Sequence, residues 1–142
     1  MTFAVTFTVD GNPVAKGRPR FAKRGKFVQT YTPQKTKDYE SLVMDAASEA
    51  MGSSEPLDTP MKIFIHIRMP IPKSASKKVR QDCLDQLIRP TKKPDWDNVA
   101  KAITDALNGI VYVDDCQIVD AHVTKRYSEE AGVDVIVMEE LP

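Results

Sequence analysis

Apolar and polar positions alternate along four segments of the chain. These segments are residues 2–9, 62–69, 117–127 and 133–138. A period of two is typical of strands that bury one face. Residues 110–113 form a further short apolar segment, which we expect to be a strand. The pattern therefore predicts a small mixed β-sheet of about four to five strands.

Apolar residues recur at helical spacing in two longer segments. The first follows Thr32 and Pro33, a pair that suits a helix start, and it ends at Gly52. The second covers residues 98–108. Because these helices are interspersed with the strands, we predict an α/β fold of the α+β type with two main helices.

A third helical pattern lies in a basic, proline-flanked segment, residues 70–92. Val79, Cys83 and Leu87 recur there every four residues, which predicts a short helix over residues 76–88. The apolar stripe of this helix is narrow. We therefore expect a mobile basic arm that packs on little of its own subunit.

Length and composition indicate a single domain over residues 1–142, with 42% hydrophobic and 28% charged residues. The chain has no run of about 18 apolar residues, so we expect no membrane span. Residues 1–11 lack the basic lead of a signal peptide. Cys83 and Cys116 are isolated, which fits reduced thiols in an intracellular protein.

The net charge is zero at pH 7, but the charges are segregated along the chain. Residues 10–37 and 66–93 each carry eight Lys or Arg, against one and two Asp. Residues 38–58 carry six acids and no Lys or Arg, and residues 94–142 carry eleven acids against three bases. Such asymmetry suits a polyanion partner together with an acidic site, although solvated faces that happen to cluster are the alternative.

The first basic block combines cations with Phe21, Phe27 and Tyr31 on a segment containing Gly and Pro. We expect a loop, or an irregular hairpin that turns near Arg24 and Gly25. Basic side chains among aromatics suit contact with a nucleic-acid backbone, whereas a solvated hairpin with core-facing aromatics is the alternative. The candidate DNA-binding residues are Lys16, Arg18, Arg20, Lys23, Lys92 and Lys93.

Four aspartates carry the candidate chemistry. Asp95 and Asp97 are two residues apart, which points both carboxylates the same way on an extended segment. The following helix and short strand can return Asp114 and Asp115 beside them. Carboxylates without His or Cys form a hard-oxygen site that suits Mg²⁺ or Mn²⁺, and a nearby Lys101 can orient water or stabilise charge. Helix caps and a turn are the alternative for the same aspartates.

Other sites are less consistent with the sequence. A calcium loop starting at Asp95 would need oxygen ligands where Val99 and Ala106 stand. The chain has no GxGxxG and no P-loop, so we expect no nucleotide cofactor. His66 has no acid partner in the sequence pattern, and we expect it on the polar face of a strand rather than in catalysis.

The motifs KPDWDN and YVDDCQIVD, with Lys101 between them, resemble the RusA family of Holliday junction resolvases, in its phage and Gram-positive branch. The segments GNPVAKGRPRF, YTPQKTKDYE and IPKSASKKVRQ extend this resemblance over nearly the whole chain. It implies a small homodimer in the cytoplasm of a bacterial or phage-infected cell. Such a dimer binds four-way or branched DNA and cuts two opposing strands symmetrically, in recombination or repair. The reaction depends on Mg²⁺, for which we expect Mn²⁺ to substitute.

Carried over to this chain, the resemblance implies that Asp95, Asp97 and Asp115 are catalytic metal ligands and that Lys101 is the essential lysine. Asp114 stays open as a further ligand. Two other functions remain as alternatives. One is a Mg²⁺-dependent nuclease of relaxed specificity on branched DNA, and the other is a non-catalytic accessory protein that binds junctions.

Overall fold

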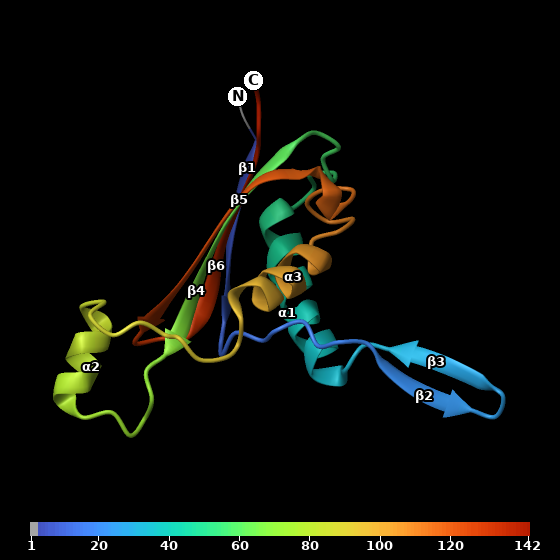
Figure 1. The fold of residues 1–142 in the computed structure, drawn as a ribbon. Helices are drawn as coiled ribbons and strands as arrows, with labels where there is room; N and C mark the ends of the chain where they lie inside the picture. The colour runs from blue at the N-terminus through green and yellow to red at the C-terminus, as the bar shows by residue number, and fades with distance from the viewer. Residues whose placement is uncertain (1–2) are drawn as a thin grey trace.

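The computed structural model describes residues 3–142, with the backbone alone for Arg24, so Thr2 of the first predicted strand lies outside the described residues. Two helices cover one face of a four-stranded mixed sheet, and a separate two-stranded hairpin projects from this body (Figure 1). The predicted α+β class is confirmed. The elements are β1 (Ala4–Asp10), β2 (Arg20–Arg24), β3 (Phe27–Tyr31), α1 (Gln34–Met51), β4 (Met61–Pro70), α2 (Lys77–Leu84), α3 (Trp96–Ala106), the 3₁₀ turn η1 (Asp115–Gln117), β5 (Ile118–Ser128) and β6 (Gly132–Glu139).

The main sheet has the strand order β1-β6-β4-β5. Strand β6 pairs antiparallel with both β1 and β4, whereas β4 and β5 are parallel. Parallel neighbours need a long connection, and here that connection carries α2, α3 and η1. The topology therefore inserts both candidate aspartate pairs between two adjacent strands of the sheet.

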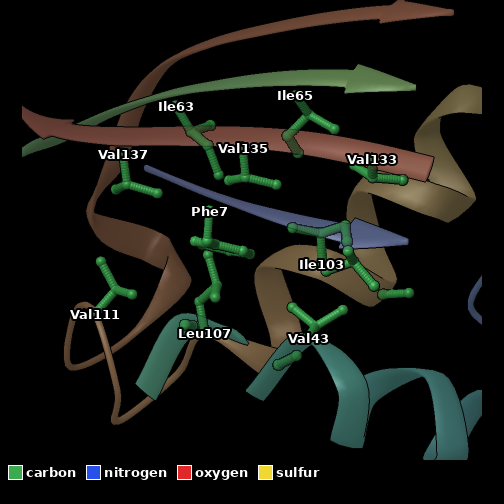
Figure 2. Packing of buried hydrophobic residues seen from close by; sticks show 14 of the residues in the cluster. Phe7, Val43, Ile63, Ile65, Ile103, Leu107, Val111, Val133, Val135 and Val137 are labelled. Carbon is green, nitrogen blue, oxygen red and sulfur yellow. The ribbon is translucent and has the colours of Figure 1, made fainter. Parts of the chain in front are cut away.

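The core lies between the covered face of the sheet and helices α1 and α3 (Figure 2). Every second residue of β1, β4 and β6 is buried, because a strand presents alternate side chains to one face. Phe7, Ile65 and Val135 from these strands belong to the same buried cluster as Val43 of α1 and Ile103 of α3. His66 lies on the opposite face, as predicted, where its Nδ1 contacts the hydroxyl of Thr124 at 2.6 Å.

Both main helices are confirmed, with small shifts at their ends. Helix α1 begins at Gln34, with Pro33 in the cap position, and it ends at Met51, followed by Gly52, whose φ is 57°. Helix α3 begins two residues before the predicted segment 98–108, because the carbonyl of Asp95 already accepts the first helical hydrogen bond, from Val99. In residues 3–142 no helix has the length and apolar character that a membrane crossing requires.

The predicted strand over residues 110–113 is wrong. This segment forms turns, with isolated bridges rather than a ladder, the longer-range one joining Tyr112 to Leu57. Gly109 has a φ of 77°, which turns the chain just after α3. Val111 and Tyr112 are both fully buried, whereas a strand would point adjacent side chains to opposite faces.

The predicted arm helix is confirmed but shorter. Helix α2 is capped by Ser76, whose hydroxyl accepts from the backbone N–H of Val79 at 3.2 Å. It ends at Leu84 rather than at Ile88. Cys83 is buried and α2 contacts β5, so the arm packs on its own subunit on one side. Its mobility stays a prediction.

Candidate active site

Asp95 and Asp97 lie at the start of α3. Asp95 occupies the N-cap position without a side-chain cap hydrogen bond, and Asp97 lies in the first turn. Both residues are exposed, and within residues 3–142 neither carboxylate pairs with a basic side chain. The positive end of the helix dipole stabilises carboxylates at this position. Because α3 already begins at Trp96, the expectation of an extended segment that points both carboxylates the same way is wrong.

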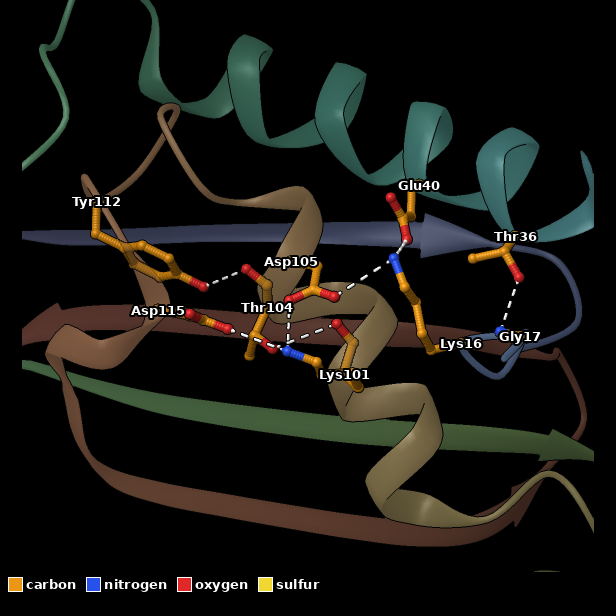
Figure 3. A network of polar contacts seen from close by, with 9 residues as sticks. All are labelled: Lys16, Gly17, Thr36, Glu40, Lys101, Thr104, Asp105, Tyr112 and Asp115. Carbon is orange, nitrogen blue, oxygen red and sulfur yellow. Dashed lines mark hydrogen bonds and ion pairs between the residues drawn. The ribbon is translucent and has the colours of Figure 1, made fainter. Parts of the chain in front are cut away.

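Lys101 lies one helical turn after Asp97 and connects α3 to the second aspartate pair. Its Nζ is 2.9 Å from Oδ1 of Asp105 and 3.6 Å from Oδ2 of Asp115 (Figure 3). The hydrogen bond that Lys101 donates to Asp105 raises the pKa of Lys101; burial lowers this pKa, and the charges of Asp105 and Asp115 raise it further. The pairing of Lys101 with Asp115 brings together two of the predicted catalytic residues.

Lys16 forms a second link across the site, from the loop after β1. Its ammonium pairs with Glu40 of α1 and lies 3.4 Å from Oδ2 of Asp105 (Figure 3). Burial lowers the pKa of Lys16, but the hydrogen bond and charge of Glu40, with those of Asp105, outweigh burial and raise it. Lys16 therefore holds the loop, α1 and α3 together, and its predicted contact with DNA stays a prediction.

The second aspartate pair is positioned by η1. Asp114 caps this turn: its carboxylate accepts from the backbone N–H of Cys116 at 3.1 Å, and the side chain of Gln117 accepts in return from the N–H of Asp114. The hydrogen bonds from Cys116 hold the pKa of Asp114 below its usual value. The amide of Gln117 also donates to two carbonyls of residues 57–59, at 2.9 Å each. This network fixes the backbone that presents Asp115.

Tyr112 lies close enough to Asp115, Asp105 and Asp114 to feel their charges, and it is fully buried. Its hydroxyl donates to the carbonyl of Thr104 at 2.7 Å (Figure 3). Burial raises the pKa of Tyr112, and the charges of Asp115, Asp105 and Asp114 raise it further. The phenol therefore stays protonated and ties the turn after α3 to the helix.

A groove of about 640 Å³ opens beside Asp95. It lies between the loop after β1, the N-terminus of α1 and the segment that enters α3. We call it the basic groove, because its lining combines one carboxylate with four cations. Its charged lining residues are Arg18, Arg20, Lys35, Lys93 and Asp95.

The structure brings some of the predicted site residues together and leaves others apart. It joins Lys101 to Asp115, and it places Arg18, Arg20 and Lys93 in the lining of the groove that also contains Asp95. Residues 3–142 contain no group of three or more His, Cys, Asp or Glu side chains gathered closely enough to hold a metal ion. The ligand roles of the aspartates therefore stay predictions. Of the remaining candidates, Lys23 and Lys92 are exposed and lie outside the groove lining.

Three residues near the site were not predicted from the sequence. Lys35 lines the basic groove, and its place within the first basic block was the available signal. Glu40 pairs with Lys16, and Lys125 donates to the carbonyls of Lys92 and Pro94 at 2.8 and 3.0 Å. The last two come from distant segments, so no local spacing could have identified them. These hydrogen bonds from Lys125 attach the segment that precedes α3 to strand β5.

Comparisons with known proteins agree with the motif resemblance. The family model described as Endodeoxyribonuclease RusA matches residues 10–138. The chain is also 41% identical over 137 residues to YqaN of Bacillus subtilis (strain 168), which is described as uncharacterized. That alignment covers 95% of this chain and 96% of YqaN. The chain therefore belongs to the RusA endodeoxyribonuclease family.

Proposed function

We propose that the protein is a Mg²⁺-dependent endonuclease that resolves Holliday junctions by hydrolysing phosphodiester bonds in two opposing strands. The observation that carries this proposal is the position of Asp95 in the basic groove, among the cations that line it. Cations along a groove attract a phosphate backbone, whereas the carboxylate repels it until a metal ion neutralises the charge. The groove is therefore suited to a metal-dependent reaction on DNA.

Asp95, Asp97 and Asp115 would hold the metal ion. Their oxygen donors suit Mg²⁺, and the first two lie at the start of α3, where the helix dipole favours negative charge. A bound Mg²⁺ would lower the pKa of a water molecule and stabilise charge on the leaving oxygen. The structure does not gather these three carboxylates into one cluster, so we assign no coordination geometry.

Lys101 would act on the phosphate rather than on the metal ion. Its ammonium contacts Asp115, and its side chain is 56% exposed, so a phosphate group can reach it from solvent. A positive charge aimed at the oxygens of the scissile phosphate stabilises the transition state more than the ground state. The ion pair with Asp105 keeps Lys101 charged and directed toward this side of α3.

We further propose that the protein acts as a homodimer, which would match the two-fold symmetry of a junction with two cleavage sites. Strand β5 lies at the edge of the sheet with Val119 63% exposed, and such an edge is a template for pairing. Antiparallel pairing of two copies about Val123 would set Asp120 opposite Arg126 of the partner subunit. Sedimentation velocity on the wild type and an Ala121→Lys variant tests this: the variant should shift a dimer toward monomer.

Cleavage of a synthetic four-way junction, with products mapped on all four strands, tests the proposed function. We expect symmetric nicks with Mg²⁺ or Mn²⁺ and none with EDTA. Asp95→Asn and Asp115→Asn should each lower the rate more than about 100-fold while keeping or strengthening junction binding, since each removes a negative charge that faces DNA. Asp45→Asn changes an exposed aspartate on the outer face of α1 and should cleave at the wild-type rate.

Two outcomes would support the other functions instead. Equal cleavage of flaps, forks and linear duplex would indicate a nuclease of relaxed specificity. Binding without cleavage at any metal concentration would indicate an accessory protein. Wild-type cleavage by Asp95→Asn would rule out the assigned site.

A further inference from the structure

The hairpin formed by β2 and β3 is a separate sheet that projects from the body of the molecule (Figure 1). All five residues of β3 are exposed. Phe21, Phe27, Val28 and Tyr31 are exposed by 72, 78, 66 and 46%, so the expected alternative of core-facing aromatics is not what the structure shows. An exposed apolar surface of this kind on a thin arm indicates a binding surface rather than a structural one.

The strand register divides these side chains between two faces. Arg20 is opposite Tyr31, and Phe27 lies on the same face as Tyr31, four residues away along β3. Lys23 is opposite Val28 on the other face, which also holds Phe21. Each face therefore combines an aromatic ring with a cation. That combination suits a ligand with flat rings and negative charges.

Charge complementarity favours nucleic acid over a protein partner. Residues 20–31 carry four Lys or Arg and no Asp or Glu. Bases stack on exposed aromatic side chains regardless of sequence, while adjacent cations contact the backbone. At the base of the hairpin, Arg18 and Arg20 line the same groove as Lys93 and Asp95, so the basic surface continues from the hairpin to the candidate active site.

We propose that the hairpin stacks on nucleobases at the branch point of branched DNA, with Phe21 and Phe27 as stacking surfaces, next to the strand that lies at Asp95. This inference rests on the proposed function, which makes branched DNA the substrate. Bases at a branch point have lost neighbours on one side, so moving them out of the stack costs less than in a continuous duplex. The hairpin then distinguishes branched from linear DNA, which the basic groove alone does not.

Equilibrium binding of the full chain in EDTA tests the inference, because this measurement involves no metal ion and no cleavage. The probes are a four-way junction, the same junction with abasic sites at the crossover, and a linear duplex. Phe27→Ala should weaken binding to the intact junction by about tenfold or more and should leave linear duplex unchanged. On the abasic junction the same substitution should add no further loss.

Two control variants separate stacking from charge and from folding. Lys23→Ala should weaken binding to all three DNAs. It should also reduce the slope of log affinity against log salt concentration by about one, the value for one lost phosphate contact. Leu42→Ala removes a 53% exposed side chain of α1 and should change nothing. Since Phe27 is outside the buried core, its removal should leave the unfolding temperature unchanged.

Three results would overturn the inference. The first is junction binding by Phe27→Ala within twofold of the wild type. The second is an equal loss on intact and abasic junctions. The third is a change of oligomeric state in Phe27→Ala without DNA, which would make the hairpin a contact between subunits. A wild type that binds no branched DNA would overturn the proposed function as well.

Discussion

Replacing Lys101 by methionine separates a catalytic from a structural role of this side chain. Methionine keeps an unbranched side chain and removes the charge. The variant loses the contacts to Asp105 at 2.9 Å and to Asp115 at 3.6 Å. Because helix propensity is nearly the same for the two residues, α3 should persist.

The effect on stability follows from the geometry. Two unit charges 3.6 Å apart interact by about 1 kcal/mol in a water-like dielectric, and exposed ion pairs contribute about 0.2–1 kcal/mol each. The Lys101 side chain is 56% exposed, so the two pairs together should contribute about 1 kcal/mol. Its loss should lower the unfolding temperature by about 2–4 °C. Loss of transition-state stabilisation should instead lower the cleavage rate by about 100- to 1,000-fold.

Thermal unfolding followed by circular dichroism and single-turnover junction cleavage give the two measurements. Lys62→Met is the matched control, because Lys62 pairs with Asp120 at 3.4 Å on the sheet face opposite the helices. It should show a similar small change in stability and wild-type cleavage. Cleavage by Lys101→Met within threefold of the wild type would refute the catalytic role. A stability loss above about 3 kcal/mol would refute the electrostatic reasoning.

Three further substitutions test the surroundings of the site. Burial raises the pKa of Tyr39 to about 12, above the value of 10.0 of the unfolded chain, and its hydroxyl has no hydrogen-bond partner in residues 3–142. The free energy of unfolding of the wild type should therefore decrease by up to about 2–3 kcal/mol as the pH rises from 10 to 12. In urea titrations, Tyr39→Phe should lack this contribution to the decrease, and at pH 7 it should be as stable as the wild type. Gly17→Ala would place a Cβ 2.9 Å from the hydroxyl of Thr36, and it should destabilise the protein by about 1–3 kcal/mol and weaken DNA binding. Gln117→Ala removes both hydrogen bonds to residues 57–59, so it should slow cleavage at least tenfold with unchanged junction affinity; an unchanged rate would contradict its positioning role.

Much of the secondary structure could be predicted because it depends on local patterns. The period of two identified β1, β4, β5 and β6, and helical spacing identified α1, α2 and α3. The prediction for residues 110–113 was wrong because four consecutive apolar residues show neither the period of a strand nor that of a helix. Their conformation depends on a turn at Gly109 and on the burial of Tyr112 against other elements.

The sequence by itself determined which candidate catalytic and DNA-binding side chains this protein carries. The DxDN motif, Lys101 and the following Asp-Asp pair identified the family, and the charge blocks identified the basic surfaces. These features are local, so residue type and spacing suffice to recognise them.

Only the tertiary structure decided which charges meet. It paired Lys16 with Glu40 and Asp105, although the sequence placed Lys16 among the DNA contacts. It also exposed Phe27 on an isolated hairpin, where sequence pattern allowed either a core-facing or a free aromatic ring. Ion pairing and burial are set by segments distant in sequence, and their partners are fixed only when the chain packs.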